Sequence, residues 1–398
     1  MARLTLGASW VLPIDGPPLR DGRVAVEDGR VVWVGRDGDS GAPDGPLRDL
    51  GPGVLLPGLV NAHCHLELSH LGGQTPFAQG FVPWVEAVIA ARARSGDGAR
   101  EACADAIRSL EERGTVAVGD VSNTLGHLDL LGASDLRAVV FLELLAWDPA
   151  RAEATLSWAD EELAAAAGRP RPGVEIRLAA HAPHSVSSEL FAALAKRGHA
   201  ASLHLAESPE ETRFLADGGG PWAEFLVRRG HGHVAFRPPG TSPVEYAESL
   251  GLLRPSLVAA HAVQLDTADR QRLSQSGAAV ALCPRSNRNI GVGMADVPAL
   301  LAAGVRLCLG TDSLASAETL DVLDDAVLLA QQFPDLDAGA LVRMATAGGA
   351  EALGFDDLGT LAPGKRAALA FAAADLPPSD PYAHLLSGEA SLRRVDIG

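Results

Sequence analysis

The feature that most constrains the fold is an alternation of short β-rich runs with longer amphipathic segments. The segments between the runs, such as residues 100–114 and 269–277, have helical character. Eight strands that each precede a helix are typical of a (β/α)8 TIM barrel, so we predict an α/β fold with such a barrel over residues 54–354. The runs that we interpret as strands cover residues 53–65, 115–123, 137–145, 174–185, 201–208, 256–263, 278–287 and 305–313.

The two ends of the chain differ from its centre. Residues 1–53 contain short strand-like runs separated by turn residues, and residues 355–398 have the same character. We expect these segments to pair into a small composite β-sandwich domain beside the barrel. The connection over residues 217–253 is long and rich in glycine and proline. A long connection at the active face of a barrel is a candidate substrate lid.

Composition and charge exclude several classes of function. The 398 residues are 47% hydrophobic, which is enough for a large core, and the formal net charge is -17. Such an acidic chain is a poor partner for nucleic acid or for an anionic membrane. The apolar N-terminal stretch is too short for a signal peptide, and the cysteines are scattered singly, as in proteins with reduced thiols. We expect a cytoplasmic protein that binds a small molecule, with a homo-oligomer left open.

Polar side chains close the predicted strands, at the end of a barrel that carries the active site. His63 and His65 close the first run, and their spacing places both imidazoles on one face of a strand. His204 and Asp312 close later runs. Three imidazoles and a carboxylate suit one divalent ion, Zn²⁺ or Fe²⁺, and leave room for a water. The predicted metal ligands are His63, His65, His204 and Asp312.

Two further residues fit catalysis by a metal-activated water. Glu207 follows His204 by three residues and could carry a proton from the water to the substrate and then to the leaving group. The alternative for Glu207 is a charge at a helix N-terminus, where it interacts favourably with the dipole. His261 closes the next run. The remaining histidines are expected to be ordinary surface or core residues: His70, His127, His199, His231, His233 and His384.

The ordered motifs resemble those of the amidohydrolase superfamily, in its mononuclear branch of aminohydrolases and chlorohydrolases. The matching motifs are PGLVNAHCH, HLAE, HAV, CPRSN and GTDSLAS, with GTLAPGKRA near the C-terminus. Binuclear members carry a lysine at the end of strand four, where RLAAHAPHS has none, so the resemblance implies one metal. It also implies that the four predicted ligands hold this metal. His261 and Asp312 would orient the attacking water, and Glu207 would protonate a ring nitrogen before ammonia leaves.

Within that branch the chain looks most like the aminodeoxyfutalosine deaminases of menaquinone biosynthesis, which act on a 6-aminopurine nucleoside. The resemblance implies that Trp84 and His181 contact the substrate. His184 stands where relatives often have tyrosine, and it is a further candidate.

Two parts of such a substrate need other contacts. Val82 and Pro83 stand where deaminases of methylthioadenosine and adenosylhomocysteine usually have an acidic residue, so Glu67 could supply the ribose contact instead. A benzoate-like tail would need a cation, for which Arg288 and Arg92 are the candidates.

Three alternatives stay open. The first is a deaminase of methylthioadenosine, adenosylhomocysteine or another nucleobase compound, and the second is a chlorohydrolase or amide hydrolase that uses the same metal water. The third is a non-catalytic binding protein, which would have no reason to keep ligands and acid/base residues together. The other family of zinc deaminases needs a P-C-x-x-C motif, which CPRSN does not supply.

Overall fold

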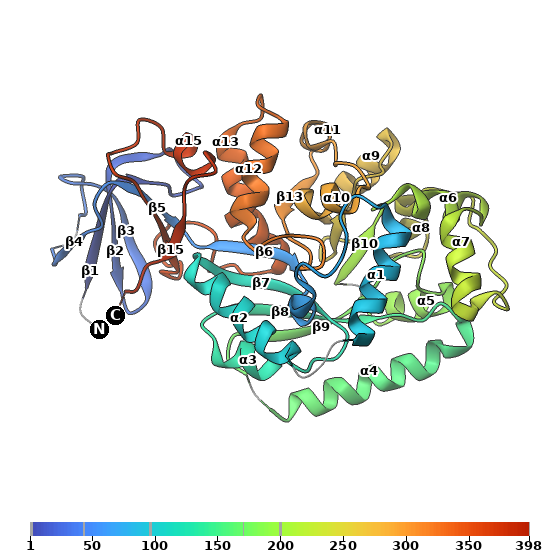
Figure 1. Ribbon diagram of the computed structural model, residues 1–398. Helices are drawn as coiled ribbons and strands as arrows, with labels where there is room; N and C mark the ends of the chain where they lie inside the picture. The colour runs from blue at the N-terminus through green and yellow to red at the C-terminus, as the bar shows by residue number, and fades with distance from the viewer. Residues whose placement is uncertain (1–2, 43, 95–97, 170, 199–200, 398) are drawn as a thin grey trace.

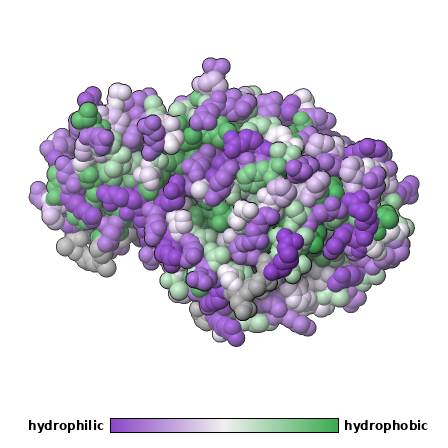
Figure 2. All heavy atoms as spheres, viewed as in Figure 1, coloured by the Kyte–Doolittle hydropathy of each residue, from purple (hydrophilic) through white to green (hydrophobic). Residues whose placement is uncertain are grey.

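The computed structural model describes residues 3–42, 44–94, 98–169, 171–198 and 201–397, so the expectation for His199 lies outside the described residues. Figure 1 shows two parts: a small β-rich part built from both ends of the chain, blue and red, and a larger part in which strands and helices alternate. Hydrophilic residues cover much of the face in Figure 2, in keeping with the net charge of -17.

The central strands form two parallel sheets of four strands each, and every predicted run contains a strand. The first sheet has the order β6 (Leu59–Cys64), β7 (Thr115–Ser122), β8 (Arg137–Leu144) and β9 (Val174–Ala180). The second has the order β10 (Ser202–Leu205), β11 (Val258–His261), β12 (Ala279–Leu282) and β13 (Arg306–Leu309).

The edges of the two parallel sheets touch at both sides. Between β9 and β10, His204 N donates to the carbonyl oxygen of His181 at 2.8 Å. Between β13 and β6, Thr311 N donates to the carbonyl oxygen of His63 at 2.9 Å, and Cys64 bridges to Asp312 in parallel register. The strand ends that carry the predicted ligands are therefore brought to one place.

Two predicted strand runs end differently from expectation. The run over residues 53–65 is two strands, because the chain breaks at Gly58 between β5 (Gly53–Pro57) and β6. A Cβ at Gly58 would lie 2.2 Å from Val116 Cγ1, so this close crossing requires glycine. The run over residues 278–287 stops at Leu282, and Pro284 then begins a helix, where its ring is well suited to the first position.

Helices follow the parallel strands and cover them. Among the described residues, no helix is both long and apolar enough to cross a membrane. The α-helices are α1 (Phe81–Arg94), α2 (Ala99–Glu112), α3 (Leu128–Ala133), α4 (Ala152–Ala167), α5 (Ser188–Lys196), α6 (Pro209–Asp217), α7 (Pro221–Leu226), α8 (Pro243–Ser249), α9 (Thr267–Ser276), α10 (Pro284–Ile290), α11 (Val297–Ala302), α12 (Val322–Gln332), α13 (Ala338–Arg343), α14 (Gly349–Leu353) and α15 (Pro381–Leu385). Shorter or wider helical segments are η1 (Leu66–Leu71), η2 (Pro149–Arg151), η3 (Val227–His231) and η4 (Met344–Gly348).

The small part is one seven-stranded sheet that draws strands from both ends of the chain. β14 (Leu369–Ala373) pairs antiparallel with β5 and with β15 (Leu392–Arg394), and β5 pairs with β1 (Leu4–Val11). The order continues through β2 (Leu19–Glu27) and β3 (Arg30–Arg36), while β4 (Leu47–Asp49) pairs with β1. Its apolar core includes Leu6, Val24, Leu55 and Phe371, so both chain ends bury side chains together.

Candidate active site

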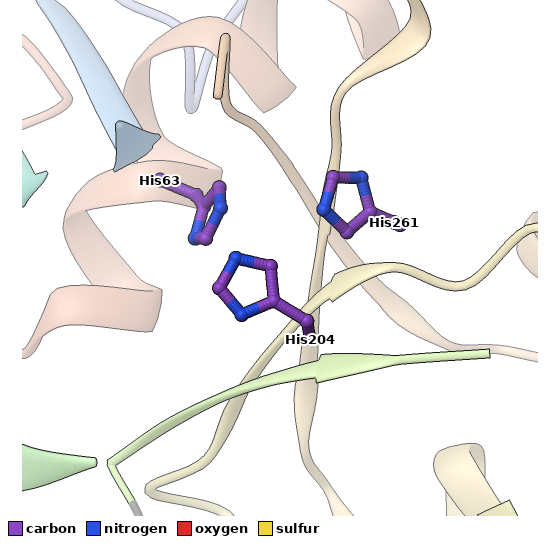
Figure 3. Close-up of side chains that lie close together, drawn as sticks. All are labelled: His63, His204 and His261. Carbon is purple, nitrogen blue, oxygen red and sulfur yellow. The ribbon is translucent and has the colours of Figure 1, made fainter. Parts of the chain in front are cut away.

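Three histidines from three strands face one another where the parallel sheets meet. Figure 3 shows the rings of His63 on β6, His204 on β10 and His261 on β11 pointing toward one another. The ring centroid of His63 lies 4.8 Å from that of His204 and 5.6 Å from that of His261. Close packing at this point requires a glycine, since a Cβ at Gly310 would lie 2.7 Å from His63 Cβ.

The predicted ligands fall into three overlapping groups that could hold a metal ion. The groups are His63, His204 and His261; His63, His65 and Asp312; and Glu143, His181 and His204; in each, the donor atoms lie within 4.8 Å of one another. His65 Nε2 lies 3.2 Å from His204 Nε2 and 3.3 Å from Asp312 Oδ1. The structure therefore brings all four predicted ligands together with His261.

Several buried nitrogen atoms in this cluster have no hydrogen-bond partner among the described residues: both ring nitrogens of His63, and Nε2 of His261. Leaving a buried polar atom unpaired costs about 1–3 kcal/mol, so a bound cation would offset a real penalty. His204 Nδ1 lies 3.0 Å from the carbonyl oxygen of His181 and must donate to it, which leaves the Nε2 lone pair of His204 for a ligand. The donor set fits a divalent transition metal.

His63, His65 and His261 favour the neutral form that a metal requires. Burial, and then the neighbouring histidines, lower the pKa of His63 and His65 well below the ordinary value. Burial lowers the pKa of His261 to about 3, against the opposing charge of Asp312. A neutral imidazole keeps a lone pair for a cation.

Asp312 keeps its charge although it is buried. Burial acts to raise its pKa, but His261, His63 and His204 and the hydroxyl of Ser316 outweigh burial, so the pKa lies below its usual value. Its Oδ2 accepts hydrogen bonds from the hydroxyls of Ser286 and Ser316, each at 2.7 Å. Two donors on one oxygen leave Oδ1 directed at the histidines.

Glu207 is a buried carboxyl group beside this cluster. Burial, and then the charges of Asp312 and Glu211, raise its pKa well above the ordinary value, which favours the protonated form. Its Oε1 lies 3.7 Å from His261 Nε2. Glu211 at the start of α6 accepts the backbone N–H groups of Glu207 at 2.8 Å and Ala206 at 3.2 Å, and so holds this segment in place.

The backbone departs from ordinary geometry at the ends of these strands. Ala206, His261, Ala262 and Asp312 have positive φ values of 53°, 74°, 50° and 60°. Non-glycine residues in this region are strained, and such strain persists where the surroundings hold the backbone firmly. At these strand ends the positive φ values direct side chains such as those of His261 and Asp312 into a shared site.

A cavity of about 360 Å³ opens over the cluster, within the range of small-molecule sites. Of the predicted substrate contacts, Trp84, His181 and His184 line it, as Glu207 does. Neither Glu67 nor Arg288 lines it, although the other cation considered for a tail, Arg92, does.

Glu67 and Arg288, the two predicted substrate contacts that do not line the cavity, have different surroundings. Glu67 Oε2 accepts hydrogen bonds from Ser122 Oγ, Asn123 N and Thr124 N at 3.0, 3.1 and 3.2 Å, so this carboxylate organises the loop after β7. Arg288 is an exposed residue of α10.

Two other polar residues that close strand runs do not line the cavity. Asp120 accepts from Leu66 N at 2.8 Å and lies 2.6 Å from His127 Nε2, so His127 is a satisfied core histidine as expected. Arg285 binds Asp325 through Nε at 3.0 Å and through Nη2 at 2.8 Å, a pairing that fastens α10 to α12.

Sequence reasoning missed several contributors to the site. Asn287 Nδ2 lies 2.9 Å from His261 Nδ1, and Ser286 contacts Asp312, so the CPRSN motif supports two site residues. Glu143 lines the cavity, and its Oε1 lies 3.4 Å from His204 Nδ1. His231 was expected to be an ordinary surface or core residue, yet it also lines the cavity. The S-P-E-E pattern before α6 is a helix-start signal that could have identified Glu211.

The fold and the site together define a class: an α/β protein whose parallel strand ends hold a histidine and aspartate cluster beside a buried glutamate. The chain belongs to the amidohydrolase family, whose profile matches residues 54–390.

Two relatives share much of this chain's length. An aminodeoxyfutalosine deaminase of Deinococcus radiodurans is 36% identical over 315 residues, which cover 76% of this chain and 73% of that protein. A 5-methylthioadenosine/S-adenosylhomocysteine deaminase of Moorella thermoacetica is 30% identical over 420 aligned positions, which cover 97% of this chain and 90% of that protein.

Two solved structures share the fold. The aminofutalosine deaminase of Helicobacter pylori in complex with methylthio-coformycin has a TM-score of 0.83 at 23% identity, covering 98% of this chain and 100% of that one. A zinc-bound adenosine deaminase from Xanthomonas campestris has a TM-score of 0.76 at 27% identity, covering 98% of this chain and 89% of that one.

Proposed function

We propose that this protein is a metal-dependent hydrolytic deaminase that releases ammonia from a 6-aminopurine nucleoside, aminodeoxyfutalosine. The observation that carries the proposal is Glu207, a carboxyl group whose pKa is raised by burial and which lines a cavity beside the histidine cluster. A carboxyl group with a raised pKa can hold a proton for a ring nitrogen when the neighbouring carbon is attacked.

One divalent ion, Zn²⁺ or Fe²⁺, would be held by His63, His65, His204 and Asp312, because their donor atoms converge and several lack other partners. Such an ion would lower the pKa of a coordinated water to about 7 and so supply a hydroxide nucleophile at neutral pH. The zinc-bound relative from Xanthomonas campestris supports a metal at this site.

Residues of the chain itself would transfer the proton and orient the attacking water. Glu207 would donate its proton to the ring nitrogen and then carry a proton to the departing amino group. Asn287 Nδ2 would donate to His261 Nδ1, so Nε2 of the neutral ring would carry the proton, donate a hydrogen bond to the attacking water and orient it together with Asp312.

The substrate would lie in the cavity against aromatic and imidazole rings. Trp84, His181 and His184 line it. Both ring nitrogens of His184 are buried and form no hydrogen bond with a described residue, although Nδ1 lies 3.9 Å from Glu211 Oε1, so Nε2 could hydrogen bond to a heterocycle. The Deinococcus radiodurans relative favours aminodeoxyfutalosine, and the Moorella thermoacetica relative supports methylthioadenosine or adenosylhomocysteine as the second candidates.

The proposal includes an architecture and a location. The edge contacts between β9 and β10 and between β13 and β6 support closure of the eight parallel strands into a (β/α)8 barrel over residues 54–354. The shared core of the small sheet supports a composite domain of residues 1–53 and 355–398, which we propose curls into a β-sandwich. Four free, buried cysteines suit the reducing cytoplasm.

The test is ammonia release by metal-replete protein from 6-amino-6-deoxyfutalosine, adenosine, methylthioadenosine, adenosylhomocysteine, guanine and cytosine. We expect the highest kcat/KM on aminodeoxyfutalosine. Greater efficiency on adenosylhomocysteine or methylthioadenosine would move the protein to the second candidates. Activity confined to guanine, or to a chlorinated triazine with chloride release, would show that the site is right and the substrate class wrong.

A further inference from the structure

The cavity has an apolar wall and a basic rim. On a helix, residues three or four positions apart share a face, and one such face each of α1 and α7 forms the wall. The wall residues are Phe81, Trp84, Val85 and Val88 from α1 and Trp222 and Phe225 from α7. Apart from the histidines at the inner end, the basic residues that line the same cavity are Arg92, Arg151, Arg229 and His231, and Asp148 lines it as well.

The rim lies far from the inner end of the wall. Phe81 and Trp222 mark the inner end, because their rings lie 5.4 and 4.4 Å from the ring of His184. Arg229 follows Trp222 by seven residues along α7 and η3. At a rise of 1.5 Å per residue, that separation is about 10 Å along the helix axis. An apolar surface of this length therefore separates the base-binding end from the cations.

The segments that carry Arg151 and Arg229 lie side by side. His233, just beyond η3, has its Nε2 3.8 Å from Asp148 Oδ2, just before η2. The rings of Trp147 and Phe236 lie 4.9 Å apart in the same region. Arg151 also lines an adjoining hollow of about 300 Å³ together with Leu145 and Trp158, and both arginines line the main cavity.

The side chains of Arg151 and Arg229 form no hydrogen bond or ion pair with another described residue. Their basic neighbours differ in this respect: Arg92 contacts Glu67 and Asn123, and Arg228 contacts Glu86 at 2.9 Å. In a chain with a net charge of -17, two unpaired guanidinium groups at a cavity mouth indicate an anionic ligand.

The helix dipole favours a cation at the position of one arginine but not at that of the other. Arg229 stands near the end of its helical segment, where a cation is favourable. Arg151 precedes the first residue of α4, where the dipole disfavours a cation and favours an anion. Asp148, the carboxylate nearest in sequence, accepts Ala150 N–H at 3.0 Å as the cap of η2. A bound anion would be favourable both to Arg151 and to the start of α4.

We propose that Arg151 and Arg229 form an anion subsite at the cavity mouth, which binds a carboxylate at the far end of an apolar substrate tail. The inference rests on the proposed function for the identity of the nucleoside, but its chemistry is independent of that function. The carboxylate could belong to an aryl acid, as on aminodeoxyfutalosine, or to the amino acid of adenosylhomocysteine. The two sources share the anion and differ in the ammonium group that the second also carries.

The first experiment compares nucleosides that share one reacting base and differ in the tail attached to it through the sugar. For Arg151→Ala and Arg229→Ala we expect kcat/KM on the two carboxylate-bearing nucleosides to fall about 10- to 100-fold, mostly through KM, as for loss of a charged hydrogen bond. On adenosine and methylthioadenosine, which lack the carboxylate, kcat/KM should not change. The matched control is Arg94→Ala, which removes an exposed arginine at the end of α1 that does not line the cavity.

The pattern of losses separates the outcomes. Equal losses on all four nucleosides would assign the arginines a structural role and overturn the subsite. A larger effect on the aryl carboxylate than on adenosylhomocysteine would identify the first as the source. No effect on either carboxylate substrate would also overturn the proposal. Arg151→Lys should recover part of the lost efficiency, because it restores the charge without the planar fork.

The second experiment does not need turnover. Trp84, Trp147 and Trp222 line the cavity, so their fluorescence should report binding of sodium benzoate, with neutral benzamide as the control. We expect Arg151→Ala and Arg229→Ala each to raise the Kd for benzoate and to leave that for benzamide unchanged. If the wild-type protein binds benzoate in this way but deaminates none of the nucleosides, the proposed function fails and the anion subsite stands. Benzoate binding that is insensitive to both substitutions would remove the subsite.

Discussion

At the residue scale, burial and the carboxylates around Glu207 raise its pKa and favour its acid form. We predict that Glu207→Gln keeps the fold and the metal but lowers kcat by about 10²-fold or more, the usual contribution of a positioned acid and base. The measurement is steady-state ammonia release alongside metal content. A variant with near-normal turnover would remove Glu207 from the mechanism, and Glu161→Gln, at an exposed position of α4 that does not line the cavity, is the control expected to keep full activity.

The raised pKa of Glu207 also predicts a pH dependence. The acid is competent below its pKa in the folded protein, and the proton is lost as the pH rises through that value, so kcat/KM should fall on the alkaline side. In Glu207→Gln, whose side chain does not titrate, the alkaline fall should be absent from the residual activity. An unchanged alkaline limb in that variant would assign the limb to another group.

The metal prediction belongs to the same scale. Protein purified with its metal should contain one divalent ion per chain, and His204→Ala should lower the metal content and abolish ammonia release, since the Nε2 of His204 faces that of His65 at 3.2 Å. His384→Ala, which removes a half-buried histidine of α15 that does not line the cavity, is the control that should retain the ion. Two tightly bound ions per chain, measured by elemental analysis, would contradict the prediction.

At the element scale, the buried pair of Arg285 and Asp325 fastens α10 to α12 and so places Ser286 and Asn287 at the site. Asp325→Ala should lower the free energy of unfolding by about 3–5 kcal/mol, because it leaves an arginine that is nearly fully buried without its partner. Denaturant unfolding of the metal-loaded protein measures this change.

Asp324→Ala provides the matched control for that substitution. Asp324 also contacts Arg285, at 3.3 Å, but its side chain is 38% exposed, so its loss should cost at most about 1 kcal/mol. Equal losses in the free energy of unfolding for the two substitutions would show that burial does not decide how strongly these carboxylates bind Arg285.

At the scale of the whole molecule, the small sheet is joined to the catalytic part through β5 and β6, which meet at Gly58. Phe371 on β14 is buried in the core that both chain ends share. We predict that Phe371→Ala lowers stability by about 3–5 kcal/mol, the usual cost of such a truncation, and leaves kcat/KM unchanged below the unfolding temperature. Thermal unfolding and a room-temperature assay measure the two effects, and a large loss of kcat/KM at room temperature would show that the small sheet shapes the site.

The sequence alone determined the order of elements and most of the candidate site. Strand periodicity placed a strand in every predicted run, and the H-x-H spacing correctly placed His63 and His65 on one side, because alternation of side chains is a local property of an extended chain. The resemblance of the ordered motifs to the amidohydrolase family is confirmed by the match over residues 54–390.

The tertiary structure alone decided which polar side chains share a space. Arg285 and Glu143 both close or follow strands in the sequence, yet Arg285 is directed into a salt bridge with α12 while Glu143 lines the cavity. Likewise, Arg288 does not line the cavity, whereas Arg151 and Arg229, on two distant connections, do. Local pattern specifies the element on which a residue lies, but the direction of a long side chain depends on backbone turns such as the positive φ at His261 and on partners far away in the chain.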